Sequence, residues 1–157
     1  MPVGQITNPL AEEGENASNG SLEETYVNGD SVALAVGQLV EFIVPFTGAG
    51  TTLQVKRSST TPDFLLAGVV TGGSAPGQPA AVGGPVTVLV KGKAQIICDD
   101  TGGGVTAGDN LQQSTTTAGQ AKTTTTTATV GKTIGVALQT VTIASGSALV
   151  YAAIHLL

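Results

Sequence analysis

From Val86 to Leu157, short apolar runs alternate with glycine-bearing turns, and this alternation constrains the fold more than any other feature of the chain. Valine, isoleucine and threonine favour the pleated, half-buried surface of a strand. Gly-Asp, Ala-Gly and Ser-Gly steps supply the turns between such strands. The pattern predicts β-structure and contains no obvious catalytic set, so we expect function to reside in surface and shape.

The core has to be built from aliphatic side chains. The chain has 157 residues, enough for one domain, and hydrophobic residues make up 41% of it while aromatic residues make up only 3%. A core without large rings is thin, which favours support from a partner subunit.

Charge and hydropathy exclude two classes of partner. Charged residues make up 11% of the chain and the net charge is -5. Six Lys and Arg residues cannot form the basic stripe that neutralises a row of phosphates, so we expect no direct contact with nucleic acid. No run approaches the ~18 apolar residues of a membrane span, and the N-terminus lacks the order of a signal peptide. We expect no membrane contact and synthesis without an export signal.

Residues 1–30 are polar, acidic and interrupted by Pro and Gly, and they hold five of the glutamates. We interpret them as an extended N-terminal arm outside the core. Val3, Ile6 and Leu10, with Thr7 among them, are isolated in this solvated segment, as in a strand that pairs only when it finds an edge. A simply disordered tail is the alternative.

Residues 31–157 are expected to form a single all-β domain of eight to ten short strands, a small sandwich or barrel. The continuous apolar run 64–70 predicts a fully buried strand. Residues 72–85, rich in Gly and Pro, predict a surface loop between two halves of the domain. The Thr run 123–127 fits a threonine-surfaced hairpin leg better than a disordered tract.

Two isolated motifs resemble ligand sites. Gly131-Lys132-Thr133 resembles the end of a phosphate-binding loop, but position 126 is Thr and a strand-like run follows in place of a helix. The spacing of Asp99, Asp100 and Asp109 matches neither an EF-hand loop nor the glycine-rich β-roll repeat, and turn-forming aspartates explain them better. We expect neither a metal nor a cofactor.

The two residues best suited to catalysis also have simpler explanations. Cys98, the one cysteine, follows two isoleucines and is expected to be a small buried hydrophobe. His155, the one histidine, is the only candidate base for a serine hydrolase, but no G-x-S-x-G pattern accompanies it. We expect a strand-face or interface histidine, no catalytic residues and no enzyme.

Five segments, in this order, resemble the head-decoration, or capsid cement, proteins of tailed phages. They are Gly37-Gln38-Leu39-Val40, Val88 to Ala94, Ala107 to Leu111, Gly131 to Leu138 and Gly146 to Tyr151, followed by an apolar C-terminal strand. The resemblance covers the chain from about residue 35 to its end.

The resemblance implies a small β-tulip-like protein that binds the outside of the expanded head as a homotrimer and clamps the major capsid protein. It also implies that the N-terminal arm reaches the capsid, which makes Val3, Ile6, Thr7 and Leu10 the candidate contacts. Such a protein is made in the host cytoplasm and ends on the outer surface of the virion. A phage tail or fibre-associated module, or a carbohydrate-binding β module, is the alternative.

Overall fold

The computed structural model describes residues 15–16, 20–45, 53–61, 65–99, 103–124 and 133–156. These residues form strands joined by turns, without a helix, so the predicted all-β class is confirmed, and none of them belongs to a helix able to cross a membrane. The strands are β1 Glu15–Asn16, β2 Ser21–Asn28, β3 Leu39–Phe42, β4 Gln54–Arg57, β5 Leu66–Gly72, β6 Pro85–Asp99, β7 Gly104–Val105, β8 Asn110–Gln113, β9 Ala121–Thr124, β10 Thr133–Ala137, β11 Val141–Thr142 and β12 Ser147–His155.

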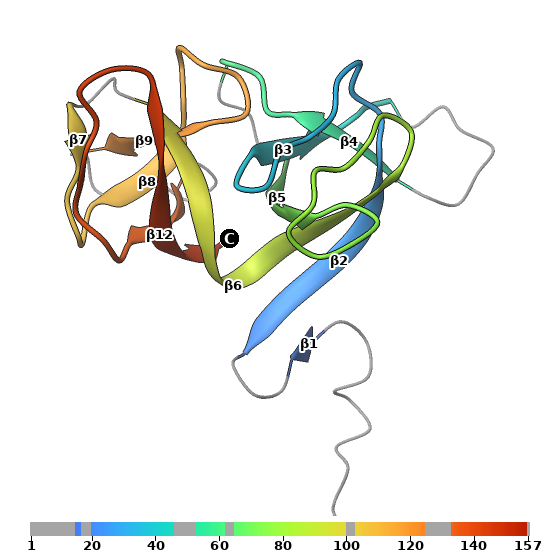
Figure 1. The fold of residues 1–157 in the computed structure, drawn as a ribbon, viewed down its shortest axis with the longest axis horizontal. Helices are drawn as coiled ribbons and strands as arrows, with labels where there is room; N and C mark the ends of the chain where they lie inside the picture. The colour runs from blue at the N-terminus through green and yellow to red at the C-terminus, as the bar shows by residue number, and fades with distance from the viewer. Residues whose placement is uncertain are drawn as a thin grey trace, which may run out of the picture.

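Two barrels share the long strand β6. Strands β2, β4, β3, β5 and β6 form the first barrel, which closes where β2 pairs with β6. Strands β6, β12, β10, β8 and β9 form the second, which closes where Cys98 of β6 pairs with Ala121 of β9. Figure 1 shows the two barrels as separate lobes with β6 running from one into the other. Closure leaves few open sheet edges.

The middle of the molecule is buried on both sides. Successive side chains of a strand point to opposite faces, so β3 sends Leu39 into the core of the second barrel and Val40 into the core of the first. Val69 and Val70 of β5 divide in the same way. This confirms the fully buried strand predicted from the continuous apolar run.

Gly92 is the point at which β6 leaves the first barrel and enters the second. The preceding residue, Lys91, pairs with Leu22 of β2 and with His155 of β12, so strands of both barrels meet there. Gly92 has a φ of +135°, and a Cβ placed on it would lie 2.6 Å from Ser21 Oγ and 3.2 Å from Ser21 Cα. A side chain is therefore excluded by backbone conformation and by space.

The first barrel begins earlier in the chain than we expected. Residues 20–30, assigned above to the arm, contain β2, which pairs along β6 from Leu22 to Val27. The Tyr26 side chain of β2 is 6% exposed, and its ring meets that of Phe42 edge-on at 5.3 Å. Exposed Glu and Thr residues on the strand hide this burial in the sequence. Of the remaining arm residues, Glu15 and Asn16 form β1, which pairs with β2, and the others, including Val3, Ile6, Thr7 and Leu10, lie outside the described residues.

The Gly- and Pro-rich loop also lies elsewhere in the fold than predicted. It joins β5 to β6, which pair directly, so it is a connection within the first barrel and does not separate two halves of the domain. Most of the loop is exposed, but Ala80 is fully buried and its backbone pairs with that of Leu34. Of the Thr run, Thr123 and Thr124 lie in β9, and the rest lies outside the described residues.

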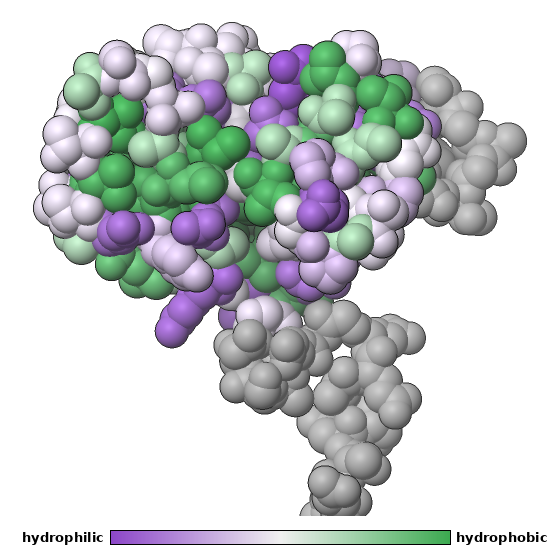
Figure 2. All heavy atoms as spheres, viewed as in Figure 1, coloured by the Kyte–Doolittle hydropathy of each residue, from purple (hydrophilic) through white to green (hydrophobic). Residues whose placement is uncertain are grey.

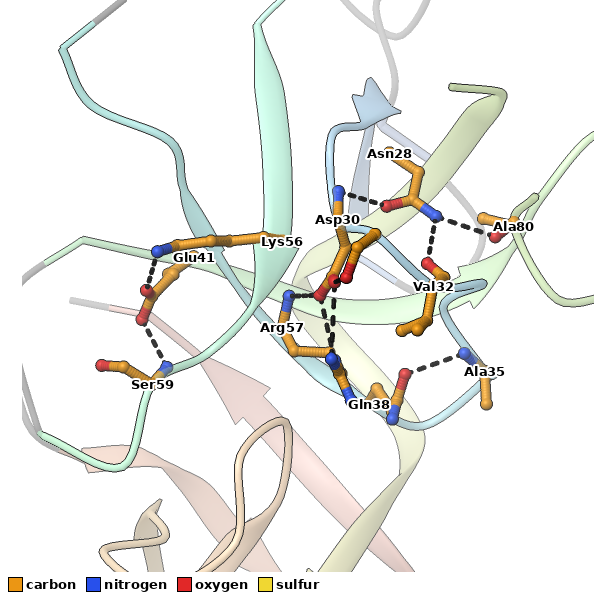
Figure 3. A network of polar contacts seen from close by, with 11 residues as sticks. Asn28, Asp30, Val32, Ala35, Gln38, Glu41, Lys56, Arg57, Ser59 and Ala80 are labelled. Atoms are coloured by element: carbon orange, nitrogen blue, oxygen red, sulfur yellow. Dashed lines mark hydrogen bonds and ion pairs between the residues drawn. The ribbon is translucent and has the colours of Figure 1, made fainter. Parts of the chain in front are cut away.

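A network of polar side chains fixes the loops of the first barrel (Figure 3). The Asn28 amide donates to the carbonyls of Val32 and Ala80, both at 3.0 Å. The Asp30 carboxylate accepts hydrogen bonds from the backbone N–H and the Nε of Arg57, at 3.0 and 2.9 Å. Burial alone would raise the pKa of Asp30, but the hydrogen bonds and charge of Arg57 outweigh it and lower the pKa to about 2.

Replacing Gly92 with Ala is expected to destabilise the protein by about 1–3 kcal/mol, because the strained φ and the contact with Ser21 both oppose a Cβ. Gly77→Ala is the matched control: Gly77 has a φ of +73° with no atom within 4 Å of the added Cβ, so it carries only the conformational cost of about 1 kcal/mol. Urea unfolding measures both. Equal losses would contradict the close packing at Gly92.

Replacing Asp30 with Asn is expected to lower the free energy of unfolding at neutral pH by about 1.5–3 kcal/mol, the range for hydrogen bonds to a charged group. The pKa of Asp30 is lower in the folded protein than its ordinary 3.8, so its contribution is present above 3.8 and lost as the pH falls through about 2. The gap between wild type and variant should therefore narrow over that range in acid titrations of stability. A constant gap would contradict the charged pairing.

Candidate interaction surface

The outer face of the second barrel carries apolar side chains on three adjacent strands, with the exposed Gln95 of β6 opposite Tyr151 as a polar residue among them. Leu138, just after β10, donates its N–H to the carbonyl of Tyr151 on β12 at 2.8 Å, and Leu149 of β12 lies opposite Ile97 of β6. The exposed fractions of Leu138, Leu149 and Tyr151 are 48%, 46% and 50%. We call this surface the apolar face; it comprises Ile97, Val136, Leu138, Leu149, Tyr151 and Ala153. Figure 2 shows hydrophobic residues gathered over this lobe.

The same strands are apolar on their inner side. Val150, Ala152 and Ile154 of β12 are buried in the second core together with Ile96 of β6. An antiparallel sheet with one face on a core normally shows polar side chains on the other. A contiguous exposed apolar patch marks an interaction site on many soluble proteins. The apolar face is therefore the candidate functional surface of the chain.

A sequence signal for this face was present in the run from Ala148 to Ile154, where the outward positions are as apolar as the inward ones. However, the run does not indicate which strands pair with it or in which register. Leu138 and Ile97 join the face only because β10 and β6 flank β12.

Two lysines border the apolar face on β6. Lys93 lies opposite Ala153 and Lys91 opposite His155, and both lysines are exposed. Two other cations are ion-paired, Arg57 with Asp30 at 2.9 Å and Lys56 with Glu41 at 3.4 Å, while Lys122 donates to the Thr115 hydroxyl at 2.7 Å. Within the described part of the chain, neither Lys91 nor Lys93 has an ion-pair partner. The face is thus apolar with a positive border.

A pocket of about 260 Å³ opens on the outer side of the first barrel. Thr71 of β5, Thr87 of β6 and Glu23 of β2 line it from the strands. The loop after β5 supplies the remaining wall, which consists of Gly72, Gly73, Ser74, Ala75 and Pro76. Glu23 is exposed and gives the pocket a negative rim.

Cys98 lies in the core of the second barrel and is fully buried, as predicted. Burial, and secondly the charge of Asp99, raise the pKa of the Cys98 thiol to about 12. The side chain therefore stays a neutral thiol and packs as a small hydrophobe.

The aspartates form hydrogen bonds within the chain. Asp109 accepts from the Thr106 N–H at 2.8 Å, which confirms a turn role. Asp99 is 3% exposed and accepts from the hydroxyls of Ser114 and Thr116. Asp100 lies outside the described residues. Among the residues that are described, no three His, Cys, Asp or Glu side chains group as metal ligands.

The remaining motif residues lie apart from one another. His155 ends β12, half-buried, with Lys91 as its strand partner. Thr133 opens strand β10, which confirms that a strand follows the Gly-Lys-Thr motif, while Gly131 and Lys132 lie outside the described residues.

No protein-family model matches the chain, and no curated protein matches it. Among solved structures, the crystal structure of the head fiber gp8.5 N base in bacteriophage phi29 is similar. The TM-score is 0.50 at 15% sequence identity, and the match covers 85% of this chain and 93% of that one. At this identity the similarity speaks for a shared fold: the all-β architecture described above also occurs in a protein of a phage head.

Proposed function

We propose that the protein is a structural component of a tailed-phage head, which binds the outside of the expanded capsid as a homotrimer and stabilises the lattice of the major capsid protein. The observation that carries the proposal is the apolar face, because a soluble barrel with Leu138, Leu149 and Tyr151 exposed on one side is suited to assembly. The fold shared with a phage head fiber base supports the assignment to the head.

The proposed role needs no reaction. A capsid cement contributes interface free energy that opposes the outward pressure of packaged DNA, and many copies add their contributions. The buried thiol of Cys98 and the paired or hydrogen-bonded Asp30, Asp99 and Asp109 are consistent with a structural protein that is not an enzyme.

We propose that Val3, Ile6, Thr7 and Leu10 contact the major capsid protein. An extended segment can add as a strand to a sheet edge, with main-chain hydrogen bonds giving affinity and alternate side chains filling pockets. Three such segments on one trimer would bind jointly, which raises the effective concentration of each segment after the first has bound.

The triple variant Val3→Asp, Ile6→Asp and Leu10→Asp is expected to lose at least about tenfold in affinity for expanded heads, since burying a charge in an apolar contact costs more than the about 1.4 kcal/mol that tenfold represents. Co-sedimentation with purified heads of the phage that carries the gene measures it. Wild type should bind expanded heads and leave precursor heads unbound.

Charge itself is controlled by the triple variant Ala17→Asp, Ser18→Asp and Asn19→Asp, in the polar part of the N-terminal segment. That control should bind as wild type does. Wild-type protein that ignores expanded heads would overturn the proposed function, and full binding by the triple variant would overturn only the assignment of the contact residues.

A second candidate role follows from the particular structure that the fold resembles. The similar protein is a head fiber base, and the alternative proposal is that this chain is a fibre-associated module of the head. Electron microscopy of particles decorated with the protein separates the two roles, because a cement gives compact density around the capsid subunits and a fibre base gives isolated projections.

A further inference from the structure

The apolar face and the pocket of the first barrel carry opposite charges at their edges. Tyr151 is half-exposed on the face and lies opposite Gln95 of β6, and Lys93 is two positions further along that strand. The pocket carries Glu23 at its rim, and Ala75 and Pro76 give it an apolar wall. One surface thus offers a half-exposed aromatic ring with a lysine nearby, and the other offers a pocket with a carboxylate at its rim.

The size of the pocket favours a side chain as its occupant. Its volume of about 260 Å³ lies below the range of about 300–1,000 Å³ that is usual for small-molecule and cofactor sites. A single phenol ring fits that space. The hydroxyl of Tyr151 can donate to the Glu23 carboxylate, and buried tyrosines normally find such a partner.

The two surfaces belong to different barrels of one chain, which defines the kind of contact between copies. Two-fold pairing would place the same patch on both sides. A face on the second barrel that meets a pocket on the first is a head-to-tail contact, and such contacts close into rings when the rotation allows. A three-membered ring is the trimer of the proposed function.

We propose that the apolar face of one copy docks on the first barrel of a second copy of this chain, with Tyr151 in the pocket lined by Glu23, Thr87 and Pro76 and with Lys93 paired to Glu23. The inference rests on the proposed trimer. Tyrosine at the centre of an apolar patch with charges at the rim is the usual anatomy of a protein interface.

The contact is tested by light scattering of the purified full-length protein during size-exclusion chromatography. Wild type should have the mass of three chains. Tyr151→Ala should have the mass of one, and so should Ser74→Trp, which fills the pocket from an exposed position outside the core. The matched control is Val82→Ala, which removes part of a side chain that is 57% exposed and does not line the pocket, and this variant should remain trimeric.

A charge exchange makes the test specific, because rescue by a second substitution distinguishes loss of the contact from misfolding. Lys93→Glu should shift the protein to one chain mass, and adding Glu23→Lys to the same chain should restore three, because each contact again joins opposite charges. Circular dichroism melts report whether each variant is folded. A trimer that persists in folded Tyr151→Ala and Lys93→Glu variants overturns the contact and leaves the proposed function standing.

Head binding separates the remaining outcomes. A wild-type chain that is monomeric overturns the ring, and its co-sedimentation with expanded heads then decides the head assignment independently. Loss of the trimer in Val82→Ala as well as Tyr151→Ala would also overturn the contact, because the effect would not be specific to the pocket and the face.

Discussion

The whole molecule depends on one strand that belongs to two barrels. β6 pairs with β2 and β5 in its first half and with β12 in its second, and Gly92 lies where the halves meet. Two five-stranded barrels built separately would need another strand and a linker. Sharing β6 instead fixes the barrels to each other through continuous backbone hydrogen bonds, which explains how a chain poor in aromatic residues holds two thin cores in one rigid arrangement.

The arrangement of the two barrels explains why the apolar face is exposed. β5 and β12 are both apolar on their two sides, but for β5 the molecule itself supplies the cover, since Val69 packs in one core and Val70 in the other. β12 packs against a core only on the side of the strand that carries Val150, and Tyr151 on the other side is half-exposed. The same sequence pattern thus marks a strand between two cores in one place and a strand with one side still exposed in the other.

The sequence was informative where one residue pattern implies one local structure. The β class, the buried run before Gly72 and the buried state of Cys98 followed from β-propensity and apolar character alone. β2 falls within the segment that the sequence predicts as the arm, because its exposed Glu23, Glu24 and Thr25 conceal a strand buried at Ser21, Tyr26 and Asn28. A strand with few buried side chains is stabilised by the strands it pairs with, and the residue composition of the segment does not show which strands those are.

The pairing register of the strands could not be predicted from the sequence either. Whether the chain forms one barrel or two depends on which half of β6 each partner meets, and a pairing as small as that of Cys98 with Ala121 closes the second barrel. The pocket and the apolar face also depend on strand pairing, since Glu23, Thr87 and Thr71 come together only when β2, β5 and β6 pair. Four of the six cations lie elsewhere in the chain. Lys91 and Lys93 therefore give the border of the apolar face a positive charge, opposite in sign to that of Glu23 in the first barrel. A chain with so few charged residues can therefore specify a head-to-tail contact by the positions of its charges instead of by their number.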